Sequence, residues 1–206
     1  MAPHQPITDV PNHHAHHPGF AGVSGLLCAI GMAVGRSAHA DLAIRLVDLR
    51  PGDHVVDVGC GPGSAARRAA RAGARVTGVD PAPVMLSVAR RLTRGGAVTY
   101  LEGKAEALPL GAGSAHALWA IATVHHWPDV EAGVAEALRV LDTGGRFLAV
   151  ERRSRPGATG LASHGWTDEQ AGAFAALCRT AGFADVRREP HRAGRRSLVA
   201  VLATKP

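Results

Sequence analysis

The sequence predicts an α/β fold built on a parallel sheet, and two adjacent stretches of the chain carry this prediction. Val55, Val56 and Val58 form a short apolar run of β-branched residues, typical of a strand buried on both faces of a parallel sheet. A glycine-rich turn follows at residues 59–63, and residues 62–72 are then rich in Ala and Arg, as in a helix. A strand, a glycine turn and a helix in this order form a nucleotide site at the carboxyl end of a sheet strand.

The glycine spacing indicates which nucleotide the turn suits. A dinucleotide fingerprint requires Gly-x-Gly-x-x-Gly, but here Gly59 and Gly61 are followed by Gly63, one place too early. The turn still lets the backbone approach a ligand closely, because glycine has no Cβ. The sequence therefore favours a nucleotide other than a dinucleotide.

Two acidic residues add further recognition groups. Asp57 lies in the end of the first strand, where its carboxylate accepts either from an ammonium group or from amides of the turn. A second strand is predicted over residues 75–79, and Asp80 follows it directly. An acid at the end of the second strand accepts hydrogen bonds from both hydroxyls of a ribose. We therefore expect a ligand that contains a ribose.

Two motifs carry a resemblance to a known family. Residues 56–63, Val-Asp-Val-Gly-Cys-Gly-Pro-Gly, and residues 78–86, Gly-Val-Asp-Pro-Ala-Pro-Val-Met-Leu, resemble the class I methyltransferases that use S-adenosylmethionine. The sequence is most similar to the type 11 small-molecule group, which includes ubiquinone and menaquinone C-methyltransferases. The resemblance covers residues 37–206. It implies a Rossmann-like, doubly wound sheet of seven strands, mostly parallel with an antiparallel last strand, and helices on both faces.

The resemblance also implies the cofactor, S-adenosylmethionine, and its product, S-adenosylhomocysteine. Asp57 and the turn at residues 59–63 would hold the methionine portion, Asp80 the ribose, and later residues the adenine. The expected cofactor-binding residues are Asp57, Gly59, Cys60, Gly61, Gly63, Asp80, Pro81, Met85, Lys104, Ala105, Glu106 and Ala120. For Met85, a place in the core without any contact to adenine is an equally good interpretation.

Two positions depart from the family pattern. Residues 102–110, Glu-Gly-Lys-Ala-Glu-Ala-Leu-Pro-Leu, resemble the family's Gly-Asp-Ala-Glu-x-Leu-Pro-Phe, whose Asp accepts from the adenine amino group. Lys104 stands at that position and can only donate, so either the backbone at Ala105 suffices or adenine binding is weakened. His116 replaces an acid that usually begins the fourth strand. We expect both exchanges to lower the negative charge near the cofactor.

Two histidines follow the fourth strand, where the resembled fold faces the methyl group. His125 and His126 are the candidate catalytic residues, because a neutral imidazole accepts a proton from the methyl acceptor. The alternative is that one caps the next helix and the other packs structurally. We expect no metal to be required, since the sulfonium carries its own leaving group.

The remaining pattern predicts helices and strands in alternation. Apolar spacing, Pro-Gly breaks and glycine stops predict helices over 38–49, 84–94, 130–141 and 167–181, and strands over 98–101, 114–121, 147–150, 184–188 and 197–203. Asp129 is the expected N-cap of one helix, and Thr167 with Gln170 forms a capping box on the next. Gly144-Gly145 is expected to stop the helix that precedes the fifth strand, and a basic loop over 191–196 to join the last two strands.

The chain is expected to divide into residues 1–36, a histidine-rich tail with an apolar cover helix, and residues 37–206, the methyltransferase domain. The tail holds five histidines and suits either a metal-binding tract or a mobile segment that folds over the site. Residues 20–35 are apolar and too short to span a bilayer comfortably. Apolar cover over the pocket would suit an apolar or aromatic acceptor.

Composition sets the outer bounds of the function. The 206 residues suit one domain, and the three cysteines lack metal or disulfide spacing, which fits a cytoplasmic enzyme without a secretory leader. The formal charge of +6 suits either a nucleic-acid partner or an arginine-rich solvated surface, and the scattered basic residues favour the surface. We expect a methyltransferase that acts on a small molecule, as a monomer or homodimer. The alternatives are a nucleic-acid methyltransferase and a cofactor-binding protein without catalysis.

Overall fold

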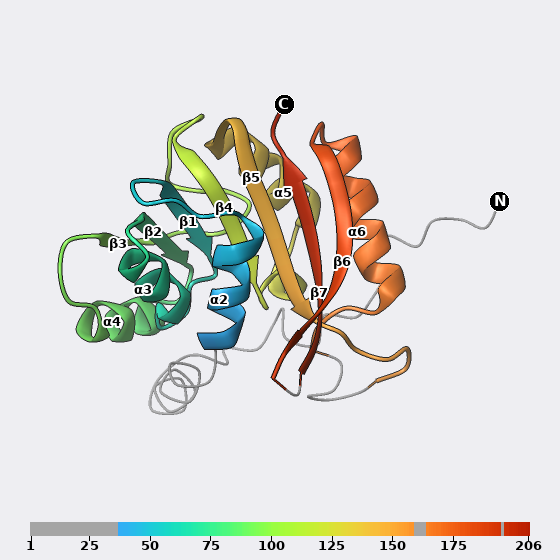
Figure 1. Ribbon diagram of the computed structural model, residues 1–206, viewed down its shortest axis with the longest axis horizontal. Helices are drawn as coiled ribbons and strands as arrows, with labels where there is room; N and C mark the ends of the chain where they lie inside the picture. Colours follow the sequence, from blue (N-terminus) through green and yellow to red (C-terminus); the bar gives the residue numbers. More distant parts are fainter. Residues whose placement is uncertain (1–36, 159–163, 195) are drawn as a thin grey trace.

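The computed structural model describes residues 37–158, 164–194 and 196–206, which form one seven-stranded sheet with helices on both faces (Figure 1). The strands are β1 (His54–Val58), β2 (Arg75–Asp80), β3 (Val98–Glu102), β4 (Ala115–Ile121), β5 (Leu141–Arg152), β6 (Ala184–Ala193) and β7 (Arg196–Thr204). The helices are α2 (Ser37–Leu46), α3 (Ser64–Arg71), α4 (Pro83–Leu92), α5 (Val130–Val140) and α6 (Asp168–Thr180), and a short 3-10 turn, η2, spans Val124–His126.

The strand order, β3-β2-β1-β4-β5-β7-β6, confirms the predicted fold class. Strands β1 to β5 pair in parallel, and β7 lies antiparallel between β5 and β6, as the resemblance implied. The chain runs outward from β1 to β3 and then returns to the other side of β1 to begin β4. The order thus reverses between β1 and β4, and the loops that leave such a switch point diverge and open a crevice at the carboxyl edge.

Apolar side chains on the two faces of the sheet form two separate clusters. Alternation along β4 turns Trp119 toward α2, α3 and α4, and Leu118 toward α5 and α6. Figure 1 shows α2 on the near face of the sheet and α5 on the far one. The sheet is therefore covered on both faces, which explains why β1 and β4 at its centre are mostly apolar rather than alternating regularly with polar residues.

Both predicted helix caps are confirmed. Oδ1 of Asp129 accepts from the backbone N–H of Ala132 at 2.9 Å, at the start of α5. Thr167 and Gln170 form the reciprocal capping box at the start of α6. Each cap satisfies backbone donors that the helix itself leaves unpaired.

The end of α5 differs from the prediction. The helix stops at Val140, and Leu141 already pairs with Ala115 of β4, so Gly144 and Gly145 lie inside β5 rather than at the helix stop. The register of β5 on β4 shifts after this first pair. Sheet pairing at Leu141 therefore ends the helix before the glycines are reached.

The last two strands are also longer than predicted. Strand β6 continues to Ala193 and β7 begins at Arg196, with His191 opposite Leu198 and Arg192 opposite Ser197. Most of the expected basic loop over 191–196 is thus paired strand. Cross-strand pairing extends the hairpin through these residues. Their sequence lacks the alternation of apolar and polar residues that predicts a strand.

The expected tail and cover helix over residues 1–36 lie outside the described residues. Among the helices of residues 37–206 that are described, none combines the length and apolar character needed to cross a bilayer.

An ion pair on α5 fixes the loop that follows β3. Glu136 accepts from Arg139 at 2.6 and 2.8 Å, and its Oε2 also accepts from the backbone N–H of Leu108 at 2.8 Å. Arg139 in turn donates to the carbonyl oxygens of Leu110 and Leu108, at 2.9 and 3.2 Å. These hydrogen bonds hold the segment next to the predicted adenine residues against the far face of the sheet.

We predict that Glu136→Gln lowers the free energy of unfolding by about 1–2 kcal/mol at pH 7, because it removes charge-assisted hydrogen bonds. Hydrogen bonding to Arg139 lowers the pKa of Glu136 below its ordinary value of 4.5. Stability from an acid with a lowered pKa is present above the ordinary value and is lost as the pH falls through the lowered pKa. Urea unfolding at pH 7 and at pH 3.5 should therefore show the difference from wild type shrinking at the lower pH. The exposed Glu131→Gln on the same helix is the control, and an equal loss at both pH values would contradict the prediction.

Candidate active site

The turn after β1 is held so tightly that its first residue has to be glycine. The backbone N–H groups of Gly59 and Cys60 donate to the Val79 carbonyl oxygen, at 2.8 and 3.1 Å. Gly59 has a φ of +68°, and a Cβ there would lie 2.1 Å from Oγ1 of Thr123. The turn after β1 and the loop after β4 are therefore in direct contact at the switch point of the sheet.

Asp80 ties this turn to the end of β2. Its Oδ2 accepts from the backbone N–H of Gly61 at 2.8 Å, and its Oδ1 accepts from that of Ala82 at 2.9 Å. Burial raises the pKa of the Asp80 carboxyl group, and these two backbone donors offset part of the rise. Each carboxylate oxygen has a second lone pair, so Asp80 can hold the turn and still accept from ribose hydroxyls.

The space beside Gly61 suits a ligand. Gly61 has a φ of +53°, and a Cβ built on it would meet no atom within 4 Å. The Gly61 N–H points to Asp80, and the open space lies where a Cβ would stand in any other residue. A ligand can therefore approach the turn from that direction. The open space and the acceptor atoms of Asp80 therefore fit a nucleoside such as that of S-adenosylmethionine, and contact of Asp80 with its ribose stays a prediction.

Tyr100 on β3 supports the same turn and was missed by the sequence analysis. A Cβ on Gly63 would lie 2.1 Å from the Tyr100 hydroxyl oxygen, and one on Gly78 would lie 2.8 Å from its ring. The hydroxyl group pairs with Oγ1 of Thr93 at 2.9 Å, and burial raises its pKa. The sequence placed Tyr100 in a strand, but its contact with the two glycines arises only when the strands pair.

Asp57 and Cys60 are both buried behind the turn. Asp57 lies opposite Gly78 on one side and Trp119 on the other. Burial, followed by the charges of Asp57 and Asp80, raises the pKa of the Cys60 thiol well above its ordinary value. Cys60 is consequently a neutral thiol, which packs beside the cofactor turn and lacks the thiolate needed for nucleophilic attack.

The residues predicted for the adenine side sit at the same edge of the sheet in different surroundings. Lys104 is exposed, and Ala105 beside it is buried. Oε1 of Glu106 accepts from the backbone N–H of Asp129 at 3.2 Å, so this carboxylate supports the start of α5. Contact of these residues with adenine stays a prediction.

Three further predicted residues flank the site. Met85 is 2% exposed and packs with Val88, which agrees with the core alternative for this side chain. Pro81 is exposed just before α4. Ala120 is fully buried in β4, opposite Val58 of β1. Their contact with the cofactor likewise stays a prediction.

The expectation that His116 affects the charge near the cofactor is wrong. Nδ1 of His116 accepts from the backbone N–H of His54 at 3.1 Å, and Nε2 lies 3.9 Å from Asp142. His54 opens β1, so His116 lies at the amino edge of the sheet, whereas Asp80 and the glycine turn lie at the carboxyl edge. A residue that begins a parallel strand is separated from the ligand by the length of that strand.

His125 is fixed by Glu151, a buried acid at the end of β5. Oε2 of Glu151 lies 2.9 Å from Nδ1 of His125, and Oε1 accepts from the His125 backbone N–H at 3.4 Å. A carboxylate only accepts, so Nδ1 carries the proton and the Nε2 lone pair is left for another partner. Nε2 is buried and has no hydrogen-bond partner within the parts of residues 37–206 that are described. The sequence analysis missed Glu151, although a lone acid directly after the apolar run of β5 was the available signal.

A cavity of about 280 Å³ opens beside this pair. All but one of its lining residues are of a polar or charged type, and the lining consists of His39, Ala122, His125, His126, Glu151, Arg152, His164 and Arg196. The two predicted catalytic histidines therefore share one cavity with two further histidines, His39 and His164, and with two arginines. No sequence pattern indicated these last four residues, because they belong to a helix, a loop and strand ends.

Ala122 has a strained backbone where the chain leaves β4 for this cavity. Its φ is +54°, which is unfavourable for a residue with a Cβ, and its N–H donates to the Val150 carbonyl oxygen at 2.7 Å. The kink directs the chain into η2, which carries His125 and His126. Strain of this kind is typical of positions where a functional geometry is enforced.

Comparison with known proteins shows similarity to methyltransferases. Residues 56–149 match the family described as a methyltransferase domain. A structure of an S-adenosylmethionine-dependent methyltransferase from Aquifex aeolicus superposes with a TM-score of 0.72, covering 88% of this chain and 98% of that one, at 15% identity. The superposition shows that the chain shares the fold of an S-adenosylmethionine-dependent methyltransferase, and residues 56–149 resemble a methyltransferase domain.

Within that class, the sequence is similar to quinone methyltransferases. It is 40% identical over 103 residues to a ubiquinone/menaquinone biosynthesis C-methyltransferase of Methylobacterium nodulans, covering 47% of this chain and 41% of that protein. It is 36% identical over 131 residues to a demethylmenaquinone methyltransferase of Thermus thermophilus, covering 61% and 58%. The resemblance found in the motifs is thus confirmed, and the chain spans about half the length of these relatives.

We predict that two neighbouring glycines respond differently to substitution. Gly59→Ala combines a positive φ with a clash against Thr123 and should lower the free energy of unfolding by about 2–4 kcal/mol. The new Cβ of Gly61→Ala meets open space, so the free energy of unfolding should fall by only about 1 kcal/mol, because of the positive φ. Its new Cβ would nevertheless stand where the cofactor approaches, so it should weaken S-adenosylmethionine binding more than tenfold. Urea unfolding and calorimetry measure the two effects. Equal losses of stability, or unchanged affinity in Gly61→Ala, would contradict this interpretation.

Proposed function

We propose that this protein transfers the methyl group of S-adenosylmethionine to a small molecule, an aromatic or otherwise apolar compound that carries an ionisable hydroxyl group. One observation carries the proposal: the cofactor turn and the histidine cavity meet at the switch point. Gly59 of the turn touches Thr123, which directly follows the cavity residue Ala122. A methyl group on a cofactor held by the turn would face a molecule in the cavity, and such alignment is the main requirement of this reaction.

The lining of the cavity favours an acceptor with an acidic oxygen. Arg152 and Arg196 supply positive charge, and His125 presents its Nε2 lone pair. A volume of about 280 Å³ admits a small molecule or its reacting ring. The relatives named as quinone methyltransferases support phenols and quinols as the first acceptors to test, and residues 20–35 are the predicted cover for their apolar parts.

His125 is the proposed proton acceptor, with Glu151 as its positioning residue. The acceptor hydroxyl would donate to Nε2 while the buried carboxylate of Glu151 stabilises the imidazolium that forms. His126 is the second candidate, because it lies on the same turn and its ring centroid is 3.9 Å from that of His125.

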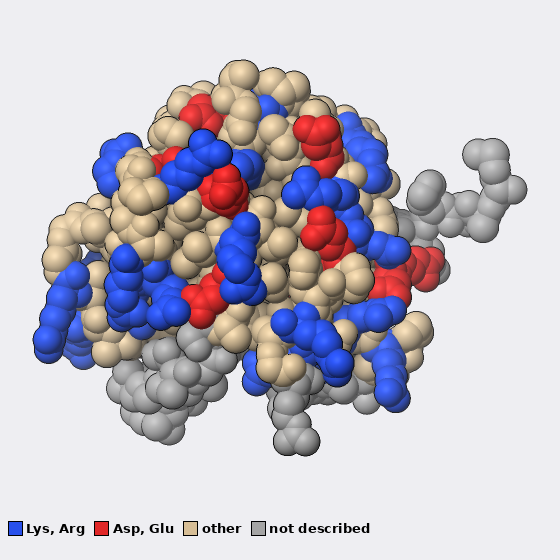
Figure 2. Space-filling view, in the orientation of Figure 1, with Lys and Arg blue, Asp and Glu red and all other residues tan. Residues whose placement is uncertain are grey.

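The two alternative functions have less support. On the face shown in Figure 2, basic side chains are spread over several elements with acidic ones between many of them, which is not the continuous basic stripe of a nucleic-acid site. A protein that binds the cofactor without catalysis would show binding but no turnover with any acceptor. The turnover measurement with phenols and quinols therefore tests the second alternative.

We predict that S-adenosylmethionine and S-adenosylhomocysteine bind with micromolar dissociation constants in calorimetric titrations. Asp80→Ala should weaken both at least tenfold, because it removes the ribose partner and frees the Gly61 amide. Glu131→Ala, at an exposed acid of α5, is the matched control and should bind as wild type does. Absence of binding to the wild type would contradict the proposal at its first step.

We predict that His125→Gln lowers kcat about a hundredfold or more with an acceptor identified by screening phenols and quinols, because general base catalysis is lost. Glu151→Gln keeps the size of the side chain and removes its charge, so it should lower kcat less than His125→Gln does. Both variants should bind S-adenosylmethionine within twofold of wild type. Unchanged turnover in His125→Gln would exclude this histidine as the base.

A further inference from the structure

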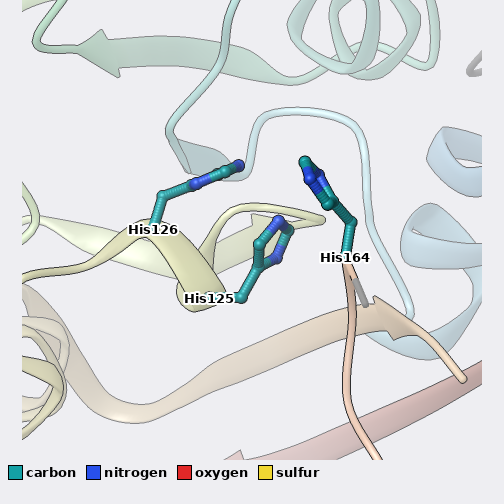
Figure 3. A group of neighbouring side chains, drawn as sticks. All are labelled: His125, His126 and His164. Carbon is teal, nitrogen blue, oxygen red and sulfur yellow. The ribbon is translucent and has the colours of Figure 1, made fainter. Parts of the chain in front are cut away.

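Three histidine rings meet at the mouth of the acceptor cavity. The ring centroids of His125 and His126 are 3.9 Å apart. The ring centroid of His164 lies 5.7 Å from that of His125 and 6.0 Å from that of His126. One ring nitrogen from each residue lies within 4.8 Å of the other two. Figure 3 shows the three rings gathered around one space, two from the turn after β4 and one from the segment after β5.

His164 is brought to this place by its neighbours in the chain. Trp166 is 2% exposed, and its backbone N–H donates to the Arg152 carbonyl oxygen at 2.9 Å while its own carbonyl accepts from Ser154 at 2.8 Å. A Cβ on Gly165 would lie 2.1 Å from the Arg152 carbonyl oxygen, so only glycine fits between His164 and this anchor. Packing thus fixes the backbone directly behind the His164 side chain.

Glu151 prepares one of the three rings as a ligand. It holds Nδ1–H of His125 and leaves Nε2 as a buried lone pair that faces the cavity. A carboxylate behind a histidine in this way is the usual support of a metal-bound imidazole, since it fixes the tautomer and raises the basicity of the ligand nitrogen.

We infer that His125, His126 and His164 form a binding site for one divalent transition-metal ion of the zinc type. Three imidazoles suit zinc, cobalt or nickel, whereas magnesium and calcium require oxygen ligands. In a tetrahedral zinc site the ligand nitrogens are about 3.4 Å apart, given Zn–N bonds of about 2.0–2.1 Å. The observed spacing, within 4.8 Å, reaches this value when the rings turn inward by about 1 Å or less.

Three protein ligands leave a fourth position, and it opens to the cavity. An ion here adds two positive charges beside Arg152 and Arg196, with only Glu151 opposing them among the lining residues. This balance favours an anionic oxygen as the fourth ligand, which matches the acceptor hydroxyl of the proposed function. A bound ion would act there as a Lewis acid that lowers the pKa of this hydroxyl, in place of the His125 lone pair.

The test is zinc binding to the metal-free, full-length protein, which does not depend on methyl transfer. Because the five histidines of residues 1–36 are themselves potential metal ligands, the measurement uses a variant in which His4, His13, His14, His16 and His17 are replaced by Ala. We expect one zinc ion per chain with a micromolar or lower dissociation constant by calorimetry. We also expect the visible absorption of a low-coordinate site when Co²⁺ replaces zinc.

Single variants identify the ligands. His164→Ala and His126→Ala should each weaken zinc at least tenfold, and Glu151→Gln, through its effect on His125, about tenfold to a hundredfold. His116→Ala, at an exposed histidine of the opposite edge, is the control and should leave affinity unchanged. S-adenosylmethionine titration and circular dichroism of each variant establish that it is folded.

The outcomes separate this inference from the proposed function. The metal site would be overturned if the variant without the five N-terminal histidines bound no zinc, or if His164→Ala bound zinc as tightly as its parent. Neither result would affect cofactor binding or turnover. Zinc binding without any affinity for S-adenosylmethionine in the parent protein would support the metal site and contradict the methyltransferase proposal.

Discussion

The hydrogen bond from the Gly61 amide to the buried carboxylate of Asp80 joins the ends of β1 and β2, and the rest of the site depends on this link. It sets the turn in a left-handed conformation that glycine adopts without strain. The turn is then pressed against the loop after β4 at Gly59 and Thr123, so a shift in either would displace the other. One contact thus joins the turn proposed to hold the cofactor to the loop that leads into the proposed acceptor cavity.

The cavity proposed for the acceptor is built largely from the ends of β4 and β5, which are neighbours in the sheet. Ala122 leaves β4 with a strained backbone, and Glu151 at the end of β5 reaches back to hold His125. A buried carboxylate is costly unless it is hydrogen-bonded, and this one has both a ring N–H and a backbone N–H as donors. The pair therefore stabilises its own geometry while it leaves the Nε2 lone pair directed at the cavity.

A proton and a metal ion compete for that same lone pair, so the two proposed roles of His125 are alternatives in one molecule. Each role requires the same tautomer, and Glu151 imposes it in both cases. What distinguishes them is the participation of His126 and His164, which a proton acceptor does not need and an ion does. Arg152 and Arg196 would assist His125 in either role. Proton transfer and metal binding each produce a negatively charged oxygen in the cavity, which the two arginines would stabilise.

The sequence by itself determined the fold class, the glycine turn after β1, the acid at the end of β2, the two helix caps and the place of His125 and His126 after β4. These features depend on local patterns: apolar runs, glycine spacing and capping residues that act within a few positions. Only the tertiary structure decided that Leu141 leaves α5 for the sheet, that His116 lies at the far edge, and that Tyr100, Glu151 and His164 belong to the site. Each of these depends on which strands pair and in what register, because pairing brings together residues that are distant in the chain and that no local pattern connects.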